Sequence, residues 1–99
     1  NAYIFPGVGL GIIVSQSRIV TDEMVLAAAH SLSEQVKESD LERGRVYPPL
    51  ADIRLVSAKI AAKVAEMAYD NGFTDRERPK DILADIKDYM YRPVYPHYV

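Results

Sequence analysis

The feature that most constrains this chain is an apolar stretch near its start, over residues 7–16. Residues 8–16 are too apolar to face water on any side, so they predict a buried helix. The run from Gly7 to Val14 is far shorter than the roughly 20 residues of a transmembrane helix, so no membrane span is expected. A chain of 99 residues buries only about two-thirds of its unfolded surface, so it is marginally stable unless it packs against something else.

Three glycines open this stretch. Gly7, Gly9 and Gly11 are spaced two residues apart, not as in the G-x-G-x-x-G pattern of a dinucleotide-binding loop. The spacing favours a short helix whose glycines let it lie close against a sheet, with a phosphate-binding loop as the alternative. Just before it, residues 2–5 predict a short strand, because Ile4 and Phe5 are good strand residues. With no initiator Met and no partner strand, we expect this strand to be the edge of a sheet that lies upstream.

Hydrophobic periodicity predicts three further helices. The first covers about residues 22–37, with Thr21 as its N-cap. The second covers about residues 50–71 and ends at Asn71-Gly72. Its apolar stripe consists of Ile53, Val56, Ile60, Val64, Met67 and Ala68. The third is opened by Pro79 at its first position and has an apolar face of Ile82, Leu83, Ile86 and Met90.

The segments between these helices carry turn signals. Residues 39–42 have capping-box spacing, which predicts a separate short helical turn closed by Gly44. Residues 45–50 contain two consecutive prolines and should be an extended linker, with a polyproline ligand as the alternative. The tail, residues 91–99, is rich in tyrosine and proline. We expect it to lie across its own domain or a neighbouring subunit, and the sequence favours neither.

Composition and charge exclude several classes of function. With 48% hydrophobic and 26% charged residues, the chain is an ordinary globular one and not a disordered tail. A net charge of −2 gives no basic surface for nucleic acid or anionic lipid. The lack of cysteine excludes disulfides, thiolate metal sites and cysteine nucleophiles. It also fits a reducing compartment, and we expect a cytoplasmic protein.

Few residues offer chemistry. His30 has no second histidine or cysteine nearby, so a packed or half-exposed side chain is favoured over a metal ligand. Asp81, Asp85 and Asp88 form a carboxylate row that could suggest a metal site. Because hard cations usually collect ligands from a folded-back loop, a solvated acidic face is favoured. No catalytic constellation is visible, so no residue of the chain is predicted to be catalytic.

Four blocks of sequence nevertheless resemble one family, the malic enzymes. Residues 1–11 read N-A-Y-I-F-P-G-V-G-L-G, similar to the family's N-x-x-x-F-P-G segment before a buried helix. Residues 44–61 resemble its G-R-x-Y-P-P-L-x-x-I-x-x-V-S-x-x-I-A block. Residues 19–24 and 90–95 are similar to the start of the next family helix and to the close of bacterial members. The resemblance covers nearly the whole chain.

The resemblance implies a reaction and a fold. Malic enzymes oxidise (S)-malate with NAD or NADP and decarboxylate the product to pyruvate, using Mg²⁺ or Mn²⁺. The chain would be a mostly helical fragment, about four helices and one strand, of an α/β Rossmann-type NAD(P)-binding domain. Residues 1–37 would be its final strand-helix part, 38–90 the C-terminal helices and 91–99 an aromatic tail.

The same resemblance limits the site. The family's acid, base, metal ligands and dinucleotide glycines would lie upstream, so no cofactor-binding or metal residue is assigned here. Only Asn1 matches a family substrate residue, whose neutral amide can donate to malate. The fragment alone should be inactive, with the remainder of the enzyme chain and a homo-oligomer as partners. The alternative is a non-enzymatic helical module for interaction or oligomerisation.

Overall fold

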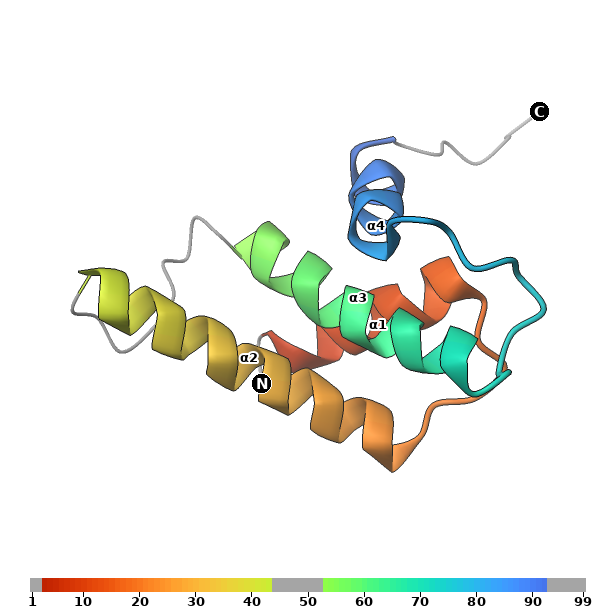
Figure 1. The fold of residues 1–99 in the computed structure, drawn as a ribbon, viewed down its shortest axis with the longest axis horizontal. Coiled ribbons are helices and arrows are strands. Elements are labelled where there is room, and N and C mark those ends of the chain that lie inside the picture. The colour runs from red at the N-terminus through yellow and green to blue at the C-terminus, as the bar shows by residue number, and fades with distance from the viewer. Residues whose placement is uncertain (1–2, 44–52, 93–99) are drawn as a thin grey trace.

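The computed structural model describes residues 3–43 and 53–92. Within them it has four helices: α1 (Ile4–Ser15), α2 (Asp22–Arg43), α3 (Ile53–Asp70) and α4 (Ile82–Tyr91). Helix α3 lies at the centre and contacts the other three (Figure 1). Helices α2 and α4 flank it without touching each other in the described part of the chain. The predicted mostly helical fold is therefore confirmed for these residues.

The predicted N-terminal strand is wrong at Ile4 and Phe5, which are the first two residues of α1. Pro6 is the third residue of the helix, where its missing N–H would have no partner within the helix. Its fixed φ also suits the first helical turn, and this outweighs the strand preference of Ile4 and Phe5. No strand is present in residues 3–43 or 53–92.

Close packing of α1 on α3 explains two of the three glycines. A Cβ on Gly7 would lie 2.5 Å from Cγ2 of Ile60, and a Cβ on Gly11 would lie 2.7 Å from the carbonyl oxygen of Ala61. The helical interpretation of this run is confirmed. The element that the glycines approach is helix α3, and the structure describes no sheet beside them.

Two helices end in the same way. In α3 the N–H of Phe73 donates to the carbonyl of Ala68 and the N–H of Gly72 to that of Tyr69, which is a Schellman motif. Gly72 has φ +71°, so the predicted Asn71-Gly72 stop is confirmed. Helix α1 forms the same pair of hydrogen bonds, but Gln16 (φ 60°) occupies the left-handed position.

Helix α2 begins as expected and ends later. The hydroxyl of Thr21 accepts a hydrogen bond from the backbone N–H of Met24 at 3.1 Å, which confirms the N-cap. The helix then continues to Arg43, so the separate helical turn predicted at residues 39–42 is wrong. Residues with capping-box spacing can also extend a helix that has already nucleated, because propagation is far easier than nucleation. Gly44 and the predicted linker 45–50 lie outside the described residues.

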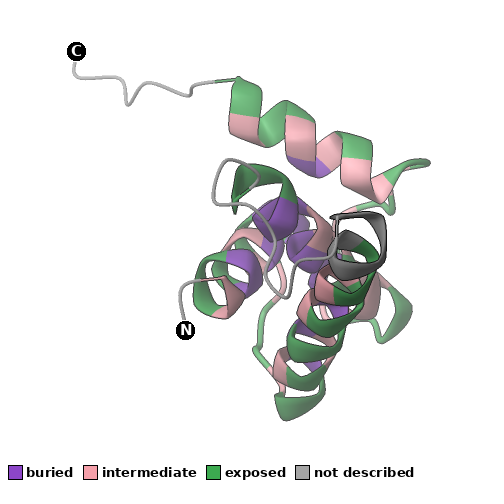
Figure 2. Cartoon of the chain, turned by 90° about the vertical axis from the view of Figure 1, so that its left-hand side faces the viewer, coloured by how far each residue is buried: buried purple, intermediate pink, exposed green. Residues whose placement is uncertain are grey.

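The core follows the predicted stripe of α3. Val56, Ile60, Val64 and Ala68 are buried and pack with Val8, Met24 and Ala28 from the two neighbouring helices. A second cluster on the other side of α3 joins Ala58, Ala61 and Ala65 to Val14 and Ile86. Ile53 and Met67, also in the predicted stripe, lie at its margin. Figure 2 shows this buried interior between the helices.

Helix α4 starts at a different residue from the one predicted. Its N-cap is Asp81, whose carboxylate accepts a hydrogen bond from the N–H of Ala84 at 3.0 Å. Pro79 lies two residues before this cap and outside the helix, so the prediction that it opens the helix is wrong. Aspartate is among the preferred N-cap residues, because its carboxylate satisfies a free backbone N–H of the first turn. The predicted apolar face is confirmed: Ile86 is buried, and Ile82, Leu83 and Met90 pack beside it.

Candidate functional site

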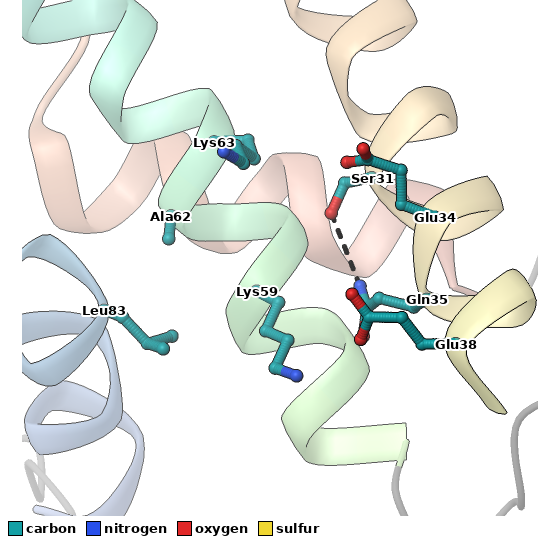
Figure 3. Close-up of a pocket in the computed structure, with 8 residues that line it drawn as sticks. All are labelled: Ser31, Glu34, Gln35, Glu38, Lys59, Ala62, Lys63 and Leu83. Atoms are coloured by element: carbon teal, nitrogen blue, oxygen red, sulfur yellow. Dashed lines mark hydrogen bonds between the residues drawn. The ribbon is translucent and has the colours of Figure 1, made fainter. Parts of the chain in front are cut away.

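One candidate for a binding site is a groove between α2 and α4, with α3 as its floor. Its cavity volume is about 390 Å³. All three helices contribute to its lining (Figure 3). The lining residues are Ser31, Glu34, Gln35 and Glu38 from α2, Lys59, Ala62 and Lys63 from α3, and Leu83 from α4. The groove exists because α2 and α4 both pack on α3 but leave a gap between them.

Hydrogen bonds fix one wall of this groove. The side-chain amide of Gln35 donates to the hydroxyl of buried Ser31 and to the backbone carbonyl of Val56, each at 3.4 Å. The charged residues are arranged more loosely. Within the described chain no ion pair joins Glu34 or Glu38 to Lys59 or Lys63, and Glu34 instead lies 3.5 Å from His30. The groove is a polar, mixed-charge surface that carries no nucleophile paired with a base.

A second hollow, of about 330 Å³, lies between α1 and α4, and the ion pair of Arg76 with Asp85 forms part of its lining. The guanidinium of Arg76 donates to both carboxylate oxygens of Asp85, at 2.8 and 3.0 Å, and also to the hydroxyl of Tyr69. Hydrogen bonding to Asp85 raises the pKa of Arg76 above its already high ordinary value, although partial burial opposes this. With its donors engaged within the chain, this cluster acts as a structural clamp.

The loops at this end are tied to each other. The hydroxyl of Thr74 donates to the carbonyl of Ser15 at 2.6 Å, and the backbone N–H of Arg18 donates to the carbonyl of Phe73 at 2.9 Å. The Arg18 guanidinium donates to the carbonyl of Gly72 at 2.8 Å. These bonds connect the C-terminal ends of α1 and α3, so the loop 71–81 is held in place beside the second hollow.

The residues singled out from sequence do not converge on one site. His30 is more exposed than expected and faces Glu34. The row of aspartates divides into three separate roles: Asp81 caps α4, Asp85 binds Arg76 and Asp88 pairs with Arg92 at 2.9 Å. The prediction of a uniformly solvated acidic face is therefore wrong for half-buried Asp85. Asn1 lies outside the described residues.

Neither a phosphate-binding glycine loop nor a cluster of metal ligands occurs among the described residues. The glycine run is helical, and Gly7 and Gly11 face α3, so their N–H groups form no loop around a phosphate. No group of three or more His, Asp or Glu side chains that could hold a metal occurs in residues 3–43 or 53–92.

No sequence pattern predicts the Arg76–Asp85 ion pair, because the two residues are nine positions apart and belong to a loop and a helix. The spacing of Gly7 and Gly11, four residues apart on one helix face, is a signal that could have identified the close contact with another helix.

Among the described residues, these features define a helical packing unit without a complete catalytic centre. No helix there is long and apolar enough to cross a membrane. Residues 1–69 match the family model described as malic enzyme, NAD binding domain. The chain belongs to the malic enzyme family.

Curated relatives match over the full chain. It is 50% identical over 99 residues to the NADP-dependent malic enzyme of Phaseolus vulgaris and 48% identical to that of Populus trichocarpa. The chloroplastic NADP-dependent malic enzyme of Flaveria pringlei is also 48% identical. In each case 99% of this chain is covered, but only 15–17% of the relative. The chain thus spans about a sixth of the length of the curated relatives it matches.

Proposed function

We propose that this chain is the C-terminal part of an NADP-dependent malic enzyme. The whole enzyme converts (S)-malate and NADP⁺ to pyruvate, CO₂ and NADPH. The observation that carries the proposal is the 50% identity over 99 residues to an enzyme of that name, together with the family match over residues 1–69. The relatives' names favour NADP over NAD as the cofactor.

The catalytic chemistry belongs to the remainder of the enzyme. A divalent metal, Mg²⁺ or Mn²⁺, would act there as a Lewis acid. No ligand for it is found among the described residues, and apart from Asn1 we assign the 99 residues a structural role. They complete a Rossmann-type NAD(P)-binding domain, and their helices brace the parts of that domain that hold cofactor and substrate.

One residue of the chain is proposed to reach the substrate. Asn1 heads the N-x-x-x-F-P-G segment, where its amide would donate a hydrogen bond to malate without adding charge. Helix α1 begins at Ile4 and is tightly packed against α3, which supports a rigid base for this position. Homo-oligomeric assembly and a cytoplasmic location complete the proposal, although some relatives are chloroplastic by name.

The test is the product balance of the full-length enzyme that ends in this chain. With (S)-malate, NADP⁺ and Mg²⁺ or Mn²⁺, we expect pyruvate, CO₂ and NADPH in equal amounts, at a higher kcat/KM than with NAD⁺. Malate binding without turnover, or reduction of NADP⁺ without release of CO₂, would overturn the proposed reaction. A pure helical interaction module would give no malate-dependent signal at all.

A further inference from the structure

The dipeptide Asn71-Gly72 at the end of α3 is chemically labile. Asparagine is among the thermolabile residues of proteins. The backbone nitrogen of the residue that follows it attacks the side-chain carbonyl carbon, and glycine hinders this attack least because it has no Cβ. Both residues are exposed in the structure. The dipeptide therefore combines the sequence and the solvent access that deamidation requires.

Deamidation needs only water as a second reactant. The nitrogen of Gly72 bonds to Cγ of Asn71, the bond from Cγ to Nδ2 breaks, and Nδ2 leaves as ammonia with the proton that the Gly72 nitrogen gives up. Water then opens the resulting succinimide ring at either of its carbonyl carbons. The products are aspartate and isoaspartate. In isoaspartate the main chain runs through Cβ and Cγ and is one carbon longer.

Hydrogen bonds of the folded chain hold both reacting groups. The side-chain amide of Asn71 donates to the carbonyl of Met67 at 2.8 Å, and the N–H of Gly72 donates to the carbonyl of Tyr69 at 3.3 Å. The attack requires the amide of Asn71 to turn toward the Gly72 nitrogen and that nitrogen to lose its proton. Both changes break these bonds, so the reaction proceeds from a state in which the last turn of α3 has opened.

Arg18 fastens this turn from outside α3. It lies in the connector that follows α1, beside the end of α3 (Figure 1). Its guanidinium donates to the carbonyl of Gly72 at 2.8 Å, and its backbone N–H donates to the carbonyl of Phe73 at 2.9 Å. A charged donor makes the first of these bonds stronger than a neutral one would. Opening of the turn therefore has to break contacts with Arg18 as well as those within α3.

We propose that Asn71 is a deamidation site of this protein and that Arg18 slows the reaction by holding the turn at Gly72 closed. The inference does not depend on the proposed function. Isoaspartate lengthens the main chain next to Gly72 and so displaces the carbonyls of Gly72 and Phe73 from Arg18. Aspartate adds a negative charge at a helix C-terminus, where it is unfavourable. Either product weakens the connection between the ends of α1 and α3.

The test follows deamidation over time in the full-length enzyme that ends in this chain, at mildly alkaline pH. Samples are digested, and peptide mass spectrometry quantifies the unmodified, aspartate and isoaspartate forms of the peptide that contains Asn71. Arg18→Met removes the guanidinium. Arg92→Met is the matched control, because Arg92 is also exposed but pairs with Asp88 in α4. Circular dichroism checks that each variant is folded, and the wild type unfolded in urea gives the unprotected rate.

We expect both products to accumulate in the folded wild type, roughly tenfold or more slowly than in urea. Arg18→Met should react about three- to tenfold faster than the folded wild type, as expected for the loss of one hydrogen bond, and Arg92→Met at the wild-type rate. If Arg18→Met does not fold, Arg18→Lys replaces it and should also react faster than Arg92→Met. Equal rates for the Arg18 and Arg92 variants, or an Asn71 that stays intact in the folded wild type while it is converted in urea, would overturn the inference.

Discussion

The guanidinium of Arg76 binds both carboxylate oxygens of Asp85, so that the loop following α3 is fastened to the first turns of α4. Less than a third of either side chain is exposed. A bidentate, partly desolvated pair is stronger than an exposed ion pair, which contributes about 0–1 kcal/mol. The pair therefore decides where α4 sits on α3, in addition to the apolar contacts of Ile86.

Replacing either partner of this pair should destabilise the chain. We expect Arg76→Met or Asp85→Asn to lower the free energy of unfolding by about 1–3 kcal/mol, because each leaves a half-buried charged group without its partner. The measurement is urea unfolding followed by circular dichroism. Arg92→Met is the control, since the Arg92–Asp88 pair is exposed, and it should cost no more than about 0.5 kcal/mol. Equal losses for Arg76→Met and Arg92→Met would contradict this account.

The contribution of Arg76 should not change with pH in the ordinary range. Its pKa is raised in the folded chain, so the stabilisation it provides is fully present below the unfolded pKa. It is lost only as the pH rises through the folded value, and both values lie far above neutrality. We expect the difference in Tm between the wild type and Arg76→Met to stay constant from about pH 6 to pH 9. A difference that shrinks over this interval would contradict the assigned cause.

Substitutions at Gln16 and Gly72, the two residues with left-handed backbone at the ends of α1 and α3, should have opposite effects on stability. The left-handed conformation of Gln16, at φ 60°, costs about 1–2 kcal/mol in steric strain, which glycine would not incur. We therefore expect Gln16→Gly to raise stability by about 1 kcal/mol, and Gly72→Ala to lower it by a similar amount because of its φ of +71°. Thermal unfolding of both variants checks the pair, and the same sign of change in both would refute the explanation.

Alanine substitutions at Gly9 and Gly11 should have opposite effects on stability, because the two glycines lie on different faces of α1. Gly11→Ala should destabilise the 99-residue chain by about 1–3 kcal/mol, because the added Cβ meets a backbone oxygen that cannot move aside. Gly9→Ala has open space and should stabilise the same chain by up to about 1 kcal/mol. Urea unfolding of the two variants gives the comparison, and a loss of stability for Gly9→Ala in this chain would be evidence against the exposed position of Gly9.

The proposed role of Asn1 concerns malate and not the dinucleotide. In the full-length enzyme, Asn1→Ala should lower kcat/KM for malate by about ten- to a hundredfold, the value of one hydrogen bond to a charged partner. Asn1→Asp should be worse, since it places a second negative charge near the substrate carboxylates. The Kd of NADP⁺, measured separately, should be unchanged. Unaltered malate kinetics in both variants would make Asn1 an ordinary loop residue.

Sequence patterns located the helices of this chain because periodicity reports local structure directly. The stripe of Val56, Ile60 and Val64 and the cap at Thr21 depend only on neighbours within a turn or two. The sequence-based predictions are wrong where one local pattern is compatible with two different structures. Ile4 and Phe5 suit a strand or the start of a helix, and Asp81 and Pro79 can both begin one.

Sequence patterns predicted less of the candidate site than of the helices. The pairing of Arg76 with Asp85 and the groove beside Ser31 depend on how separate elements meet in space, which no short motif encodes. The exposure of Phe5 and Ile13 could not be predicted from sequence for a different reason. Their apolar character predicts burial, whereas both side chains are exposed in the part of the chain that the structure describes. Asn1 was identified through the family resemblance alone.

The central claim is that this chain completes an enzyme whose catalytic groups lie elsewhere in the protein. The most direct measurement compares malate-dependent reduction of NADP⁺ by three proteins: the full-length enzyme, the same enzyme without these 99 residues, and the 99-residue chain alone. The account predicts turnover by the full-length enzyme only. Turnover by the 99-residue chain in a preparation free of full-length enzyme, or an undiminished rate in the shortened enzyme, would contradict it.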